Sequence, residues 1–338
     1  MKSILLTPFS LLYSAIIRAR LKLYERRFFK SYNLGVPTIS VGNLTVGGTG
    51  KTPLVAFIAR ILAERGEKVC VLTRGYRREN ERERVVVSDG EKILADVKKA
   101  GDEPFELAEK LLGKAVVVSD ANRAEAGLWA REKFGITVFI LDDAFQHLKV
   151  KRQLDIVCVD ATNPFGNGKI LPRGILREPL KNLKRADSIV ITRTNLVENI
   201  SELKVQISKL NPRGKIFVSE NKLSAKCKVQ NAKLIAAFCG LGNPENFFAQ
   251  LRQAGFNLIF TKTFPDHYFY TQKDVDELQR QAKTNGAECF VTTAKDAVKL
   301  RNLNFKIPLL IAENELIFDD ETAFREMVFN VSSGQQRI

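Results

Sequence analysis

The run from Thr38 to Pro53, TISVGNLTVGGTGKTP, constrains this chain more than any other stretch. An apolar strand leads into a glycine-rich turn, and a second apolar run follows at the start of a helix. Gly47, Gly48 and Gly50 carry no side chains that would keep an anion off the backbone. Their N–H groups can converge on anionic oxygens at a helix N-terminus, where the helix dipole also favours negative charge. The stretch predicts a phosphate-binding loop.

The lysine and threonine after the glycines give this loop its chemistry. In the motif G-x-x-x-x-G-K-[ST], the lysine reaches the β- and γ-phosphates and the hydroxyl ligates Mg²⁺, so Lys51 and Thr52 take these roles. Thr45 stands at the first glycine position. The alternative is a surface turn with a chance Gly-Lys-Thr, which the flanking apolar runs disfavour. The residues predicted to bind ATP are Thr45, Gly47, Gly48, Thr49, Gly50, Lys51 and Thr52.

Strand-like and helix-like segments alternate along the chain. The predicted strands of the first part are 36–41, 69–73, 85–87, 115–118, 138–141, 156–159 and 189–192, with helices at 53–64, 104–112 and 122–134. This pattern is typical of a doubly wound sheet with helices on both faces. A helix at 201–210, a strand at 215–218 and a polar linker or extended connector at 221–231 follow. A second series has strands at 234–238, 258–263, 289–292 and 309–311 and helices at 244–253 and 272–284.

The predicted fold is therefore α/β, a P-loop NTPase-like doubly wound sheet with a second, smaller α/β domain and an N-terminal membrane-associated helix. The predicted boundaries are 1–34 for that helix, 35–222 for the core domain and 223–338 for the smaller domain. Five scattered cysteines without a C-x-x-C pair indicate reduced core residues in a cytoplasmic protein rather than a metal site.

The N-terminus is apolar and then basic. Residues 4–17 are almost wholly apolar, too few to span a bilayer core of ~30 Å at ~1.5 Å per residue. We expect a helix in the membrane interface, with arginines on anionic headgroups. A signal peptide lacks its cleavage site here, and a helix packed on the protein's own core is the alternative. The residues expected in lipid are Phe9, Leu12, Ile16, Leu23 and Phe28.

Two pairs of acids stand at the ends or beginnings of elements. Asp142 and Asp143 end an apolar strand, where acids beside a phosphate-binding loop can hold Mg²⁺; solvated acids in a turn are the alternative. Asp102 and Glu103 open a helix. They either cap that helix or serve as proton acceptor and metal-side acid, and the pattern leaves both open.

The remaining candidates are a histidine and a basic loop. The chain has only two histidines, and His267 lies in a proline-bearing polar loop that suits a proton handler or a plain loop histidine. Residues 169–193 hold seven lysines and arginines against two acids, in a loop that includes Arg177 and Glu178. Such a loop can clamp phosphates or stabilise charge on a transferred phosphoryl group, or be simply solvated. The formal net charge of +15 likewise indicates an anionic partner.

Taken together, the motifs resemble one family. SVGNLTVGGTGKTP, TRGYRR, GDEP, LDDAFQH, LPRGILREP, FPDHY and TTAKDAVKL occur in this order, from about residue 5 to about residue 315. This combination closely resembles the tetraacyldisaccharide 4′-kinase (lipid A 4′-kinase) family, in which Thr45 is part of the pattern. Ala144 and Arg173 depart from it slightly, where a glycine and a small residue are common.

The resemblance implies transfer of the ATP γ-phosphate to the 4′-hydroxyl of a tetraacylated glucosamine disaccharide 1-phosphate, giving lipid IVA in lipid A biosynthesis. It implies a catalytic base, Asp102, tuned by His267, and Arg177 as an active-site residue. Thr52, Asp142, Asp143 and Glu178 would be Mg²⁺-linked, with the direct ligands among these acids and Glu103 left open. It further implies a cleft between two domains, ATP and Mg²⁺ as cofactors, and the cytoplasmic face of the bacterial inner membrane. We expect a monomer that binds no nucleic acid.

Rival classes fit the residues less well. A partitioning-type ATPase switch carries a lysine just before the two glycines, where this chain has Val46. A GTPase would show N-K-x-D, and Thr293-Ala294-Lys295-Asp296 places its lysine one position late. A nucleic-acid-binding NTPase would explain the charge but lacks interleaved aromatic and basic runs.

Overall fold

One continuous sheet of twelve strands runs through the computed structural model, which describes residues 6–76, 78–225 and 234–333. Its order is β10 (Leu258–Thr263), β9 (Ile235–Cys239), β11 (Cys289–Thr293), β12 (Leu309–Phe318), β8 (Lys215–Ala225), β7 (Ser188–Thr192), β6 (Leu154–Asp160), β1 (Thr38–Asn43), β5 (Val138–Asp142), β2 (Val69–Thr73), β4 (Ala115–Ser119) and β3 (Val85–Ser88). Neighbouring strands are parallel except at β12–β8 and β3–β4.

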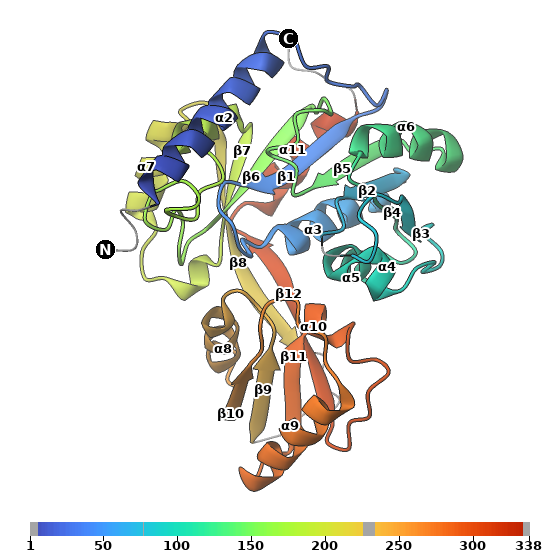
Figure 1. Ribbon diagram of the computed structural model, residues 1–338, viewed down its shortest axis with the longest axis vertical. Coiled ribbons are helices and arrows are strands. Elements are labelled where there is room, and N and C mark those ends of the chain that lie inside the picture. The colour runs from blue at the N-terminus through green and yellow to red at the C-terminus, as the bar shows by residue number, and fades with distance from the viewer. Residues whose placement is uncertain (1–5, 77, 226–233, 334–338) are drawn as a thin grey trace.

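The helices and short 3₁₀ turns lie between these strands. They are α2 (Thr7–Glu25), α3 (Lys51–Glu64), α4 (Val97–Ala100), α5 (Asp102–Lys110), α6 (Arg123–Phe134), η1 (Leu180–Arg185), η2 (Thr194–Leu196), α7 (Ser201–Leu210), α8 (Pro244–Gln253), α9 (Gln272–Thr284), α10 (Ala294–Ala297) and α11 (Glu321–Ser332). Figure 1 shows two lobes: a larger lobe around β1–β7 and a smaller lobe around β9–β11. The long strands β8 and β12 run between them.

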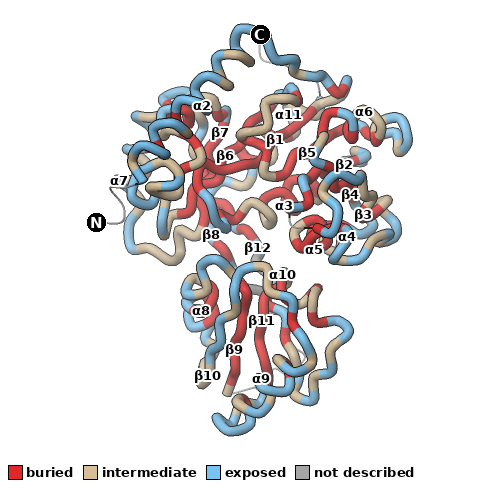
Figure 2. Tube along the Cα trace, viewed as in Figure 1, coloured by how far each residue is buried: buried red, intermediate tan, exposed pale blue. Residues whose placement is uncertain are grey.

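The central strands of the larger lobe are buried on both faces. In β5, Val138 and Ile140 pack with α3, α5 and α11, whereas Phe139 and Leu141 pack with α6 on the opposite face. Side chains alternate between the two faces of a strand, so a strand covered on both sides must be apolar throughout. Figure 2 shows these strands buried beneath partly exposed helices. The alternation explains why each predicted strand appears in the sequence as a continuous apolar run.

The smaller lobe repeats this plan on a reduced scale. Its strands β9 and β11 are wholly buried, with α8 on one face and α9 on the other. Each lobe thus has its own core, and the connection between them is made by strands rather than by a loop. The first half of β8 pairs with β7 of the larger lobe and the rest with β12.

The α/β class, the N-terminal helix and the predicted strands and helices of both series are confirmed, most with ends shifted by a few residues. The strands predicted at 215–218 and 309–311 are too short, because β8 continues to Ala225 and β12 to Phe318. The predicted connector at 221–231 is extended as far as Ala225, and its remainder lies outside the described residues. The boundary at 222/223 falls inside β8, and α11 returns to pack on α3 of the larger lobe. The domain division remains a prediction.

One smaller expectation concerns the cysteines. Cys70, Cys158, Cys239 and Cys289 are buried and unbridged, as expected for core residues, and Cys227 lies outside the described part. Burial raises the pKa of Cys158 to about 12, which keeps its thiol protonated and unreactive. At the C-terminal end, α11 continues to Ser332, and the residues after Ser333 lie outside the described part.

Candidate active site

The phosphate-binding loop joins the carboxyl end of β1 to the N-terminus of α3. Gly50 caps the helix with φ 81°, a left-handed conformation that suits glycine, and a Cβ there would lie 3.3 Å from a methyl carbon of Thr192. Asn43 Nδ2 donates to Thr49 Oγ1 at 2.9 Å, and Thr192 Oγ1 donates to the Thr49 carbonyl at 3.0 Å. These bonds hold the loop in one shape before any phosphate is present.

The acid pair lies next to this loop because β5 is hydrogen-bonded to β1. Gly42 allows the chain after β5 to approach β1 closely, since a Cβ at Gly42 would lie only 2.5 Å from the Phe145 nitrogen. Arg177 Nη1 donates to both carboxylate oxygens of Asp143 at 2.8 Å, and Lys51 Nζ lies 3.6 Å from Asp143 Oδ1. The sheet thus brings together Lys51, Asp143 and Arg177 from distant positions in the sequence.

The pKa values of the two adjacent acids, Asp142 and Asp143, are shifted in opposite directions. Burial raises the pKa of Asp142 to about 7, helped by the negative charges of Glu103 and Asp143. Its Oδ1 is buried with no hydrogen-bond partner among the described residues. Burial also acts to raise the pKa of Asp143, but Lys51 and Arg177 outweigh it and hold that pKa far below its usual range. Asp143 is therefore a paired carboxylate, whereas Asp142 has a buried oxygen with no partner among the described residues.

A second group of residues spans the two lobes. Asp102 is the first residue of α5 in the larger lobe, and Nδ1 of His267, from the smaller lobe, lies 3.1 Å from its Oδ2. The ring of Tyr76 packs edge-on against His267. Burial acts to raise the pKa of Asp102, yet the hydrogen bond from His267 and the charge of Lys299 outweigh it and lower the pKa overall. The predicted Asp102–His267 contact is thus present.

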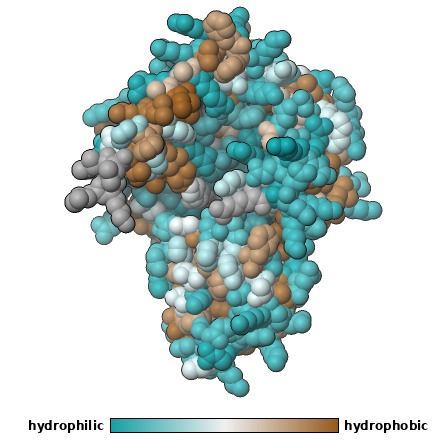
Figure 3. All heavy atoms as spheres, in the orientation of Figure 1, coloured by the Kyte–Doolittle hydropathy of each residue, from teal (hydrophilic) through white to brown (hydrophobic). Residues whose placement is uncertain are grey.

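A cavity of about 1150 Å³ lies between these two groups. Its lining includes the phosphate loop, Asp142, Asp143 and Arg177, together with Glu103, His267 and Lys295 and with Tyr13, Ile17 and Arg20 of α2. The space-filling view shows the narrowing between the lobes and an apolar patch at the position of α2 (Figure 3). Asp102 is not among the lining residues, and only 6% of its side chain is exposed.

Comparison with known proteins agrees with this geometry. Residues 2–332 match the family model described as tetraacyldisaccharide-1-P 4′-kinase. The chain belongs to this family. It is 40% identical to the tetraacyldisaccharide 4′-kinase of Pelobacter propionicus, over 97% of this chain and 92% of that protein. It is 41% identical to the Geobacter metallireducens protein of the same name, over 88% of each chain.

A solved structure extends the comparison to three dimensions. The apo form of LpxK from Aquifex aeolicus, in complex with ATP, aligns with a TM-score of 0.79 and 32% identity. The alignment covers 98% of this chain and 99% of that one. The family resemblance expected from the motifs is thereby confirmed over both lobes.

Glu178, which was predicted to be linked to Mg²⁺, lies apart from the other predicted metal-linked acids. Its carboxylate accepts hydrogen bonds from Asn182 at 2.7 Å and Arg185 at 2.8 Å, and it is not among the residues that line the cavity. Arg177 lines the cavity, whereas its neighbour Glu178 is buried and does not. Glu178 holds Arg185, and its assignment to the metal remains a prediction.

Sequence reasoning missed three cations in the site. Arg193 follows β7, donates to the Gly48 carbonyl at 2.7 Å and pairs with Asp160. Lys295 pairs with Asp266 at 2.8 Å beside His267, and Lys299 pairs with Asp102 at 3.2 Å. The only sequence signal was their position, directly after a strand or in the TTAKDAVKL motif, which by itself assigns no partner.

Backbone conformation supports the same location for the site. Asp143, Arg193 and His267 have positive φ angles of 46°, 58° and 65° and line the cavity. Such conformations cost roughly 1–3 kcal/mol each for non-glycine residues and persist where the surrounding structure enforces them. Their concentration around one cavity indicates a functional cleft. His147 also lines it, and burial with nearby arginines lowers its pKa to about 3, so it stays neutral.

Proposed function

We propose that the cavity between the lobes is where the γ-phosphoryl group of ATP passes to the 4′-hydroxyl of a tetraacylated glucosamine disaccharide 1-phosphate, giving lipid IVA. The chain is a tetraacyldisaccharide 4′-kinase of lipid A biosynthesis. One observation supports the site assignment: the phosphate loop, its acid pair and His267, whose ring contacts Asp102, line one cavity. The overall architecture is that of a P-loop kinase with a smaller α/β lobe completing the site.

The proposed nucleotide side uses the larger lobe. Backbone N–H groups of Gly47 to Gly50 and the ammonium of Lys51 bind the ATP phosphates. Arg177, held against Asp143, adds positive charge where the transferred group becomes more negative. Phosphoryl transfer needs chiefly positioning and neutralisation of charge, and these groups supply both.

The residues beside the loop fit Mg²⁺. The unpartnered Oδ1 of buried Asp142 and the hydroxyl of Thr52 are the hard oxygen donors that Mg²⁺ takes, and Asp143 adds a nearby carboxylate. No group of three His, Cys, Asp or Glu side chains forms a metal cage in the described chain, and Mg²⁺ in kinases commonly uses one or two carboxylates plus phosphate oxygens. When bound, the ion would neutralise phosphate charge.

The proposed acceptor side uses Asp102 and His267. A sugar hydroxyl attacks poorly until its proton has an acceptor, and a positioned carboxylate contributes roughly 10²–10⁴-fold to the rate. Asp102 is the base, and the Nδ1 contact with His267 orients it and stabilises its charge. Because the two residues belong to different lobes, the base is complete only when the lobes are in contact.

Incubation with γ-labelled ATP and the lipid disaccharide 1-phosphate in detergent tests this function. Label should appear in the lipid with wild-type protein and be absent with Lys51→Ala. ATP hydrolysis without labelled lipid, or stimulation of hydrolysis by DNA, would instead support one of the rival NTPase classes.

We also propose that α2 binds an anionic membrane surface. Phe9, Leu12 and Ile16 lie on one exposed face, whereas Ser10 and Ser14 face the protein and are buried. Ser10 Oγ donates to the Ile170 carbonyl at 3.0 Å, so the polar side of the helix is the docked side. No helix in the described ranges has the length and apolarity needed to cross a bilayer.

Insertion into lipid accounts for this exposed apolar face, because full burial of such a side chain contributes roughly 1.5–3 kcal/mol. A triple variant, Phe9→Ser with Leu12→Ser and Ile16→Ser, should lose flotation with phosphatidylglycerol vesicles. Its activity on substrate in detergent should persist. Unchanged flotation would show that the helix does not anchor the protein.

A further inference from the structure

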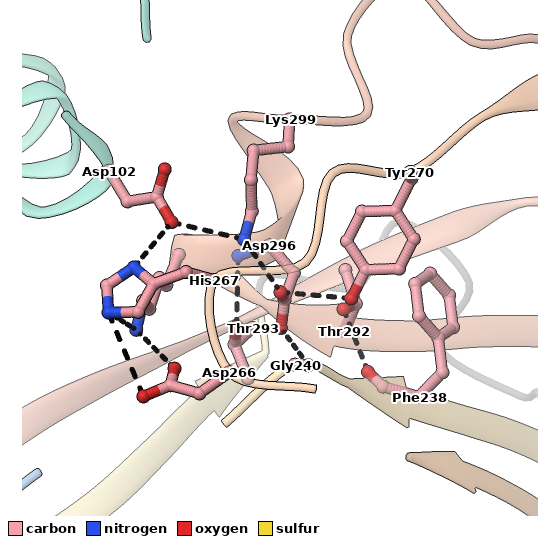
Figure 4. A network of polar contacts seen from close by, with 11 residues as sticks. Asp102, Phe238, Gly240, Asp266, His267, Tyr270, Thr292, Thr293, Asp296 and Lys299 are labelled. Carbon is pink, nitrogen blue, oxygen red and sulfur yellow. Dashed lines mark hydrogen bonds and ion pairs between the residues drawn. The ribbon is translucent and has the colours of Figure 1, made fainter. Parts of the chain in front are cut away.

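Lys299 is a buried cation that contacts the proposed base. Its side chain is 1% exposed, and Nζ lies 3.2 Å from Asp102 Oδ2 and 3.4 Å from Asp296 Oδ1. Asp102 belongs to α5 of the larger lobe, whereas Lys299 and Asp296 belong to α10 and the turn after it (Figure 4). The ammonium therefore joins one carboxylate from each side of the lobe interface.

Asp296 is itself fixed within the smaller lobe. Its carboxylate accepts hydrogen bonds from the Gly240 nitrogen at 2.9 Å, Tyr270 Oη at 3.0 Å and Thr293 Oγ1 at 2.7 Å. The residue has no exposed surface. Three donors hold this carboxylate, and the carboxylate pairs with Lys299. The smaller lobe therefore fixes the position of Lys299 independently of Asp102.

The contacts at Asp102 are asymmetric. His267 Nδ1 and Lys299 Nζ both contact Oδ2, and none of the described residues forms a hydrogen bond to Oδ1. Two fixed partners on one oxygen restrict rotation of the carboxylate. Oδ1 is left as the oxygen that can accept a proton from the acceptor hydroxyl.

We propose that Lys299 is a positioning residue for catalysis: anchored on Asp296, it orients the Asp102 carboxylate when the lobes meet. The proposal rests on Asp102 acting as the base in the function proposed above. Without Lys299, His267 alone would hold Asp102, and one contact leaves the carboxylate free to turn about it.

The surrounding charges agree with this role. Asp102 is buried, which penalises its ionised form, and the charge of Lys299 acts against that penalty to lower the pKa of Asp102. The other titratable groups around the pair are Glu103, Asp266, Lys295, Asp296 and Tyr270. Lys295 pairs with Asp266 at 2.8 Å, which leaves Lys299 as the ammonium in contact with Asp102 in the described chain.

The competing explanation is that Lys299 only neutralises buried Asp296. Two variants separate the explanations. Lys299→Met keeps the length of the side chain but leaves Asp296 buried without its cation, which destabilises the fold. The double variant Asp296→Asn with Lys299→Met removes both charges together, so the smaller lobe keeps a neutral, hydrogen-bonded core.

The experiment measures lipid phosphorylation against pH for wild type, both variants and Lys283→Met, an exposed lysine change in the same lobe. In both Lys299 variants kcat should fall about 10²-fold, the cost of a misplaced catalytic group, while the KM for ATP stays constant. The acidic limb of kcat/KM for the lipid should move to higher pH, because Asp102 has lost a cation. In an Asp102→Asn background, Lys299→Met should cause no further loss.

Wild-type turnover and an unshifted acidic limb in the double variant would overturn the proposal, since they would confine Lys299 to balancing Asp296. If Lys299→Met does not fold, the double variant alone decides between the two outcomes. Loss of lipid labelling in wild type and Lys283→Met would instead reject the proposed function, so the two failures are distinguishable.

Discussion

The two walls of the cavity are built in different ways. On the phosphate wall, Lys51 and Asp143 follow two strands that are hydrogen-bonded to each other, so the sheet fixes their separation. On the acceptor wall, His267 lines the cavity. It and Lys299 contact Asp102 from 165 and 197 residues away, with no strand pairing between them. The phosphate wall is therefore formed by one lobe alone, whereas the acceptor wall exists only while two lobes touch. Nucleotide binding and acceptor activation should respond to different changes.

The largest expected effect tests this separation directly. Asp102→Asn should reduce kcat by about 10²–10⁴-fold, because the acceptor proton loses its base, while ATP affinity stays unchanged. Lys51→Ala, its counterpart on the other wall, should weaken ATP binding roughly 10- to 100-fold through the loss of charged hydrogen bonds. Calorimetric ATP titration and lipid phosphorylation measure the two quantities. Equal losses of ATP affinity in both variants would contradict the separation of nucleotide binding from acceptor activation.

The second effect concerns pH on the phosphate wall. Since burial raises the pKa of Asp142 to about 7, its carboxylate ionises across neutrality. Mg·ATP should bind the ionised form of Asp142, so its observed affinity should rise about tenfold between pH 6 and pH 8. Binding should release a proton wherever the carboxyl is still protonated. Calorimetry in buffers of different ionisation enthalpy detects that proton. Asp142→Asn should bind more weakly and show no such release.

The thermal stability of the ligand-free protein tests the raised pKa of Asp142 independently. The folded pKa lies above the unfolded one, so the folded state holds more protons and this group's contribution to stability falls as pH rises from about 4 to about 7. Asp142→Asn, which mimics the protonated acid, should melt at a higher temperature than wild type at pH 7.5, and the gap should narrow at pH 5.5. A gap that is independent of pH would contradict the assignment.

The smallest effect is expected at a contact between the lobes that lies outside the cavity. Arg301 of the smaller lobe pairs with Glu109 of α5 and lies over the ring of Phe105, so it helps to dock the acceptor wall. It is 54% exposed, and such pairs contribute about 0–1 kcal/mol. Arg301→Ala should lower kcat by up to about fivefold and leave ATP affinity alone. A change in ATP affinity instead would mean that the two walls are coupled.

The same contrast explains what the sequence could predict. The loop at Gly47–Thr52 and the acids at Asp142 and Asp143 are local motifs at strand ends, and parallel strand ends meet at one edge of a sheet. Lys299 and Arg193 lie in a motif and directly after a strand, but these positions do not reveal their partners, which are set by packing between distant segments. The family resemblance also placed Glu178 with the metal; its carboxylate pairs with Arg185, and the assignment stays a prediction.

The position of α2 has a consequence for kinetics. Its apolar residues Phe9, Leu12 and Ile16 face outward, while Tyr13 and Ile17 line the catalytic cavity. On the proposed membrane orientation, the cavity opens at the level of the lipid headgroups, and the acceptor can reach it with its acyl chains still in the bilayer. The enzyme then samples substrate by diffusion in two dimensions. Its rate depends on the surface density of substrate, and diluting that substrate with inert lipid should slow turnover even when the bulk concentration is constant.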